Sequence, residues 1–197
     1  MASIERTAYP RLKRQPSSSE LVGSWSSSPE EDLFVTSTAR GQQSLLALAL
    51  LVLMFRRLGR FVTLHEVPLS VIDHVRCGLR LAPSVEPLVG ESTLYRHHRL
   101  VREFLQVRSW DAQARHVAVR AVHESALVMN NPADLVNVAI EALVRERYEL
   151  PAFRELDRLV RHVRAIQQLM GHTNPATTTI YTLANDTAGV LDDAGWL

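Results

Sequence analysis

One uninterrupted apolar run constrains the fold of this chain more than any other feature. Residues 45–55 read LLALALLVLMF, 11 consecutive apolar residues, flanked by Arg40 and by the Arg56–Arg57 pair. A membrane-spanning helix needs about 20 apolar residues, so this run is too short to cross a bilayer. The surrounding segment 42–58 is apolar on nearly every side, and Gly59 predicts its end. We therefore expect a central core helix that other helices must cover.

Helix-start signals and apolar periodicity predict further helices along the chain. The clearest start is Ser28-Pro29, where a capping residue and a proline precede acidic residues that complement the helix dipole. Strand-like alternation of useful length is absent from the sequence, and so are internal repeats. We therefore predict an all-α fold, with a loop at 82–90 and helices at about 29–38, 42–58, 67–81, 92–107, 111–129, 131–148 and 151–170.

The charge balance restricts how the chain can attract a polyanion. The net charge is only +1, so any affinity for nucleic acid must come from local patches. Of the 22 basic residues, Lys13 is the only lysine. Arginine suits bidentate contacts with phosphate and guanine, although biased codon usage gives the same excess.

The single cysteine limits the chemistry open to the chain, and its polar N-terminal residues limit where the protein is expected to be found. Cys77 alone excludes an internal disulfide and a cysteine-based zinc site, and its apolar neighbours predict a buried packing role. Residues 1–16 are polar and basic and lack the apolar core of a secretory signal. We expect a cytoplasmic protein in a reducing setting, with no metal and no cofactor.

The segment 92–107 is the most informative for function. Ser92 is expected to cap this helix, and Arg96, Arg99 and Arg102 recur at i, i+3 and i+6, opposite an apolar face. His98 lies at the border of the two faces. The preceding helix and turn favour a helix-turn-helix-like element that contacts DNA, whereas the commoner fate of such a stripe is a solvated surface face.

Two other groups of cations are candidate contacts. Residues 1–28 hold few apolar side chains and form either a basic arm along a phosphate backbone, with Arg11, Lys13 and Arg14, or a flexible terminus. Arg158 and Arg161 share one face of the helix expected at 151–170. We include all five among the DNA-binding candidates.

The end of the chain contains a motif with candidate chemistry. His172 lies in a short turn after Gly171, and Tyr181 follows nine residues later, near the end of a short helix. Leu169, Gly171, His172, Thr177, Thr178 and Tyr181 resemble the C-terminal signature of the tyrosine recombinases. The resemblance covers about residues 166–183 and implies that Tyr181 attacks a DNA phosphodiester while His172 supports the transition state.

The recombinase family also uses arginines, one of them in a His-x-x-Arg block a little over twenty residues upstream. The corresponding window, Arg145–Pro151, contains no such block, and Arg161 lies too close to His172. We therefore expect no complete catalytic site in the chain alone. Arginines from elsewhere, such as Arg161 or Arg164, or from another protomer, would be needed for activity.

A second and longer resemblance covers residues 1 to about 164. The matching blocks carry no chemistry of their own; they are residues 1–14, 58–61, 93–97, 102–105, 148–153 and 156–159. They resemble the N-terminal region of replicative transposases of the Tn-three family. That resemblance implies an all-helical part that helps to bind the terminal inverted repeats of a transposon. The catalytic metal-binding domain of that family lies far downstream and has no counterpart here.

The two resemblances predict three segments: a flexible basic arm (1–28), a transposase-type DNA-binding domain (29–164) and a recombinase-like fragment (165–197). We expect a DNA-binding protein of mobile-element origin, associated with the bacterial nucleoid, that binds duplex DNA without complete catalytic machinery. Strand transfer through Tyr181 and an inactive remnant are the alternatives. Self-association is left open, and no membrane contact is expected.

Overall fold

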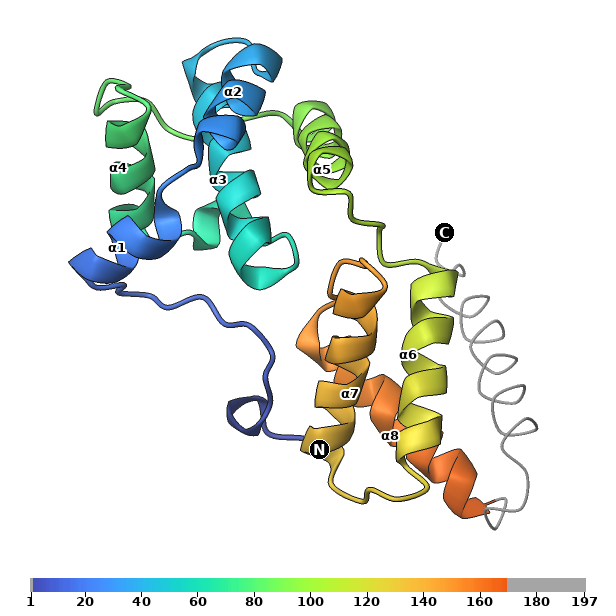
Figure 1. The fold of residues 1–197 in the computed structure, drawn as a ribbon. Coiled ribbons are helices and arrows are strands. Elements are labelled where there is room, and N and C mark those ends of the chain that lie inside the picture. The colour runs from blue at the N-terminus through green and yellow to red at the C-terminus, as the bar shows by residue number, and fades with distance from the viewer. Residues whose placement is uncertain (1, 170–197) are drawn as a thin grey trace, which may run out of the picture. The chain divides into compact units, whose positions relative to one another are not determined.

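The computed structural model describes residues 2–169 of the 197-residue chain. Its regular structure is entirely helical, and within these residues no β-strand is present. The predicted all-α fold is confirmed. In chain order the elements are η1 (Ile4–Arg6), α1 (Ser18–Trp25), α2 (Pro29–Thr38), α3 (Gln42–Leu58), η2 (Leu64–Glu66), α4 (Leu69–Gly78), α5 (Glu91–Leu105), α6 (Ala112–Ser125), α7 (Pro132–Arg145) and α8 (Phe153–Leu169) (Figure 1).

The helix boundaries follow local chemistry. α2 starts with a reciprocal capping box between Ser28 and Glu31, and α3 ends at Gly59, which adopts the left-handed conformation with φ 65°. Both boundaries agree with the prediction. α1 was not predicted, although Ser17 and Glu20 form the same capping box and mark its start.

The chain divides into two compact units, which do not follow the three expected segments. Among the described residues, unit 1 contains residues 2–9 and 109–169, and unit 2 contains residues 10–108. The expected flexible arm is shared between them. Residues 2–9 belong to unit 1, and residues 10–28, including α1, belong to unit 2.

Unit 2 is built around α3. Leu46, Leu48, Leu50 and Leu51 are fully buried, and burial continues without a break from Leu46 to Phe55. Helices α2, α4 and α5 all pack on α3, which explains why a helix apolar on every side is stable here. The prediction of a covered core helix is confirmed. Among the described helices, none is both long and apolar enough to cross a membrane.

Cys77 corrects one prediction. The thiol is exposed rather than buried. Val75 is buried on α4, and each helical residue advances by about 100°, so a residue two positions later faces the opposite side. The apolar neighbours of Cys77 line the core, but Cys77 itself does not.

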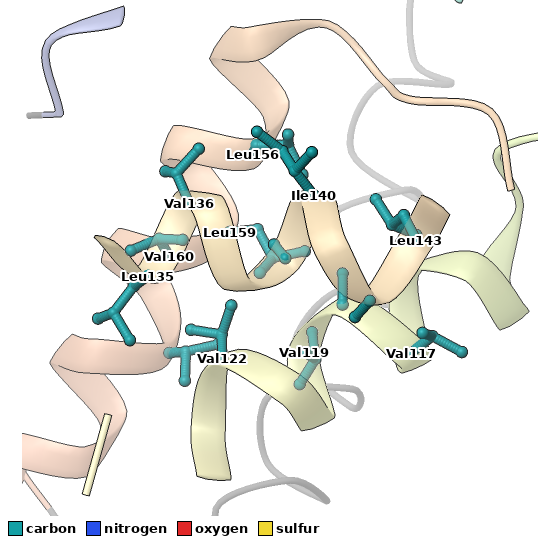
Figure 2. Packing of buried hydrophobic residues seen from close by; sticks show 14 of the residues in the cluster. Val117, Val119, Val122, Leu135, Val136, Ile140, Leu143, Leu156, Leu159 and Val160 are labelled. Atoms are coloured by element: carbon teal, nitrogen blue, oxygen red, sulfur yellow. The ribbon is translucent and has the colours of Figure 1, made fainter. Parts of the chain in front are cut away.

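Unit 1 is a three-helix arrangement of α6, α7 and α8, in which each helix packs on the other two. Figure 2 shows aliphatic side chains from all three helices interdigitating, among them Val119, Leu143 and Leu156. The N-terminal residues complete this unit. The backbone N–H of Ala2 donates to Asp157 Oδ1 at 2.8 Å, and the buried Tyr9 hydroxyl donates to the carbonyl of Pro151 at 2.7 Å.

Candidate nucleic-acid interface

Helix α5 presents two different faces. Its inner side carries Val101 and His97, both fully buried, while Phe104 stacks on Phe34 with ring centroids 4.2 Å apart. These contacts hold α5 against the rest of unit 2. The helix begins at Glu91 with Gly90 as its N-cap. The prediction that Ser92 caps the helix is therefore wrong, because Ser92 lies inside the first turn.

The predicted outer face of α5 is present, but its residues differ in exposure and in the contacts they make. Arg96 and Arg99 are exposed. Arg99 Nε lies 3.5 Å from Glu103 Oε1, and both side chains are more than 60% exposed, at 69% and 61%. Such an exposed i,i+4 pair is worth about 0.3–0.5 kcal/mol, so Arg99 can exchange its carboxylate for a phosphate at little cost.

Arg102 and His98 are held by an aromatic ring. The Arg102 guanidinium carbon lies 5.0 Å from the centroid of Phe61, and the His98 ring stacks on the same residue at 3.9 Å. Both side chains are half-buried. Arg102 therefore keeps its charge near the surface while contributing to the packing of α5, and His98 serves mainly as a packing residue.

Tyr95 was not identified from the sequence. Its side chain is 77% exposed, and it precedes Arg99 by four residues, which places both on the same side of α5. A large aromatic side chain this exposed is unusual for a helix surface. The helical spacing of Tyr95 with the arginines was the signal available in the sequence.

The element preceding α5 is not a tight helix-turn-helix. Residues 79–90 separate α4 from α5, whereas that motif uses a turn of about three or four residues. The main packing partner of α5 is α3. The exposed face of α5 is therefore presented by a helical scaffold of another kind.

The cations of the N-terminal segment lie in unit 2. Arg11 and Arg14 are exposed, but Lys13 Nζ lies 2.6 Å from Glu20 Oε1. The hydrogen bond from Lys13, followed by that from the Ser17 backbone, lowers the pKa of Glu20 to about 2. Lys13 is thus already paired with a carboxylate and is less available to a phosphate than its place among basic residues suggests.

Arg158 and Arg161 lie on α8 in unit 1. Arg158 is exposed, whereas Arg161 Nε donates to Asp157 Oδ2 at 3.1 Å. Because Asp157 is nearly fully buried and also accepts the Ala2 N–H, Arg161 stabilises a carboxylate that ties the N-terminus to α8. The candidate cations therefore belong to two different units.

The catalytic candidates His172 and Tyr181 lie outside the described residues. Within residues 2–169, no group of three or more His, Cys, Asp or Glu side chains is placed to hold a metal ion.

Comparison with protein families gives one match. The model of a domain of unknown function, DUF4158, matches residues 1–163. No curated protein and no solved structure matches the chain.

Proposed function

The chain belongs to the DUF4158 family, and we propose that it is a DNA-binding module of mobile-element origin, which binds transposon-end duplex through the exposed face of α5 and lacks complete catalytic machinery of its own. The observation that carries this proposal is the exposure of Arg96 and Arg99, with Arg102 fixed beside them on Phe61. Guanidinium groups on one helix face match both phosphate oxygens and the guanine edge.

The distribution of charge supports the same surface. Unit 2 contains 13 basic and 9 acidic residues, an excess of +4. Residues 2–9 and 109–169 of unit 1 contain 9 of each, and residues 170–197 contain only three acids. The net charge of +1 thus conceals a basic unit that carries α5. Clustered positive charge is the electrostatic footprint of nucleic-acid binding.

The resemblance to Tn-three transposases points to the kind of DNA. It covers residues 1 to about 164, nearly the same residues as the family match. In those transposases the corresponding region contributes to recognition of the terminal inverted repeats. We therefore place the module on the ends of a mobile element in the bacterial nucleoid.

The test is a titration of labelled duplex DNA at several salt concentrations. Binding through phosphates releases counterions, and each lost contact reduces the slope of log K against log salt by about 0.9. The double variant Arg96→Ala/Arg99→Ala should therefore reduce the slope by roughly 2 and weaken binding. The matched control is Arg120→Ala/Arg145→Ala, which removes the same charge from exposed positions on α6 and α7. Equal effects in the two variants, or unchanged affinity in the first, would overturn the proposal.

Strand transfer is the second candidate, because the glycine, histidine, threonine pair and tyrosine of residues 171–181 are in recombinase register. It predicts a covalent protein–DNA adduct on a nicked suicide substrate, and Tyr181→Phe should abolish that adduct. If the wild-type chain forms no adduct while still binding duplex, only the DNA-binding function stands. A chain that neither binds nor reacts would be an inactive remnant.

A further inference from the structure

We propose that the hollow between Arg40 and Arg96 in unit 2 is a seat for a single phosphate group. The hollow has a volume of about 590 Å³, within the range of about 300–1,000 Å³ typical of small-ligand sites. The seat would supply a contact to a DNA backbone phosphate beside the α5 face, and in that role it rests on the proposed DNA-binding function. Phosphate-binding chemistry can equally be tested with the free anion.

The charge of the lining selects an anion. Arg40 comes from the segment before α3 and Arg96 from α5, and both are exposed. Neither makes a hydrogen bond or ion pair to another residue in the described part of the chain. No acidic side chain lines the hollow: Glu86 and Glu91, although close in sequence, are not among its lining residues. Two arginines that line one open hollow without a carboxylate favour its occupation by an oxyanion.

The start of α3 adds backbone donors to the same hollow. Gly41 is the N-cap and has no side chain to accept from the first N–H groups, and no acidic residue lies in the first turn of α3. α2 shows the opposite arrangement, with a capping box and three acids in its first turn. The N–H groups and positive dipole end of α3 are therefore left for an external anion.

A buried histidine orients one further donor. Ser44 lines the hollow, and its Oγ lies 3.2 Å from Nε2 of His97, which is fully buried. Burial, and then the positive charge of Arg96 and the neighbouring His98, lowers the pKa of His97, so the ring is neutral near pH 7. Within residues 2–169, Nδ1 of His97 makes no hydrogen bond.

The 3.2 Å contact between Ser44 Oγ and His97 Nε2 fits either tautomer, and the seat requires the Nε2–H form, in which His97 donates to Ser44. In that form the Ser44 hydroxyl keeps its own hydrogen for a ligand in the hollow that Ser44 lines. Thr93 from the first turn of α5 lines the hollow as well and adds a second hydroxyl. The seat thus combines two arginines, two hydroxyls and the N–H groups of a helix start, the donor set that a phosphate accepts from.

Two variants test the seat without endangering the fold. Arg40→Ala removes one cation from an exposed position. Gln43→Glu places a carboxylate in the lining at the second position of α3, where a negative charge favours the helix but repels an anion. Arg145→Ala is the matched control, because it removes one exposed arginine from α7.

The full chain is titrated with inorganic phosphate while backbone amide shifts are followed by NMR, and separately with duplex DNA at several salt concentrations. We expect phosphate to shift the amides of Gln42, Gln43 and Ser44 in the wild type and in Arg145→Ala, and much less in the two seat variants. With DNA, Arg40→Ala should reduce the salt slope by about 0.9. Its loss of affinity should be similar for unrelated sequences, since a phosphate carries no sequence information.

The outcomes separate the seat from the proposed function. Duplex binding with a salt slope unchanged in both seat variants overturns the seat and leaves the α5 face intact. Amide shifts with inorganic phosphate but no DNA binding support the seat for a free phosphate and overturn the proposed function. If phosphate shifts these amides equally in the wild type and in Gln43→Glu, the shifts do not come from an anion held in the hollow and the inference is wrong.

Discussion

The two units of this chain achieve stability in different ways. The described residues of unit 1 carry equal numbers of basic and acidic side chains, and its three helices meet in an aliphatic core that the N-terminal residues close through buried hydrogen bonds. Unit 2 surrounds one helix that is apolar on nearly every side, and it carries an excess of +4 together with exposed arginines, an exposed tyrosine and a polar hollow. The contrast teaches that a total charge of +1 says little about binding when the charges are divided so unevenly.

The largest loss of stability should come from creating a cavity in the core of either unit. Leu50 in unit 2 and Leu143 in unit 1 are both fully buried, so Leu50→Ala and Leu143→Ala should each lower the free energy of unfolding by about 2–5 kcal/mol. If the units are stabilised separately, hydrogen exchange should accelerate mainly in α2–α5 for the first variant and in α6–α8 for the second. Acceleration throughout the chain in both variants would show that the units unfold as one, and would remove the contrast between them.

A smaller effect is expected at the turn before α3. Gly41 has φ 84° and ψ 153°, a region that residues with a Cβ occupy at a cost of about 1–3 kcal/mol. A Cβ there would meet no atom within 4 Å, so the cost of Gly41→Ala is one of backbone conformation. Thermal melts should show the loss in unit 2. Gly90→Ala is the control, since its φ of −68° suits alanine and its surroundings are equally open; equal losses in the two variants would contradict this explanation.

The N-terminal closure of unit 1 should contribute less. Tyr9→Phe removes the buried hydrogen bond to the Pro151 carbonyl and should lower the free energy of unfolding by about 1 kcal/mol. Tyr95→Phe removes the same hydroxyl from a side chain that is 77% exposed and should leave the stability unchanged. Chemical denaturation measures both. A Tyr9→Phe variant as stable as the wild type would mean that this buried hydrogen bond does not contribute to the stability of unit 1.

The smallest effect is one of pH, and it should be common to both units. Burial lowers the pKa of His97 in unit 2, and burial also lowers that of His123 in unit 1, where Glu124 opposes the shift. Each folded pKa lies below the unfolded value of about 6.5, so the unfolded chain takes up protons first on acidification. The stability should therefore be complete above about pH 6.5 and decrease as the pH falls toward the folded pKa.

The slope attributable to each histidine cannot exceed about 1.4 kcal/mol per pH unit. Melts of the wild type, His97→Gln and His123→Gln at pH 7.5 and 5.5 measure it by difference. Each substitution should reduce the dependence of its own unit on pH. If both variants retain the full dependence, other groups account for it.

Local signals in the sequence were sufficient for most of the helices. The apolar run and Gly59 predicted α3, and the cap, proline and acids after Ser28 predicted α2, because these signals act within one or two helical turns. The same reasoning placed Arg96 and Arg99 on an outer face, which the structure shows to be exposed. The predicted burial of Cys77 is wrong because apolar neighbours in the sequence do not fix the direction of one side chain, and the helical rotation turns Cys77 away from the core.

The sequence by itself determined the helical class, the buried α3 and the amphipathic character of α5, since helix periodicity and capping depend on residues close in the chain. Only the tertiary structure decided that Arg40 and Arg96 border one hollow, that His97 is buried against Ser44, and that Asp157 receives the N–H of Ala2. In the order given, the three pairs lie 56, 53 and 155 positions apart in the sequence. Their geometry depends on how whole helices pack, and no local pattern in a single sequence encodes it.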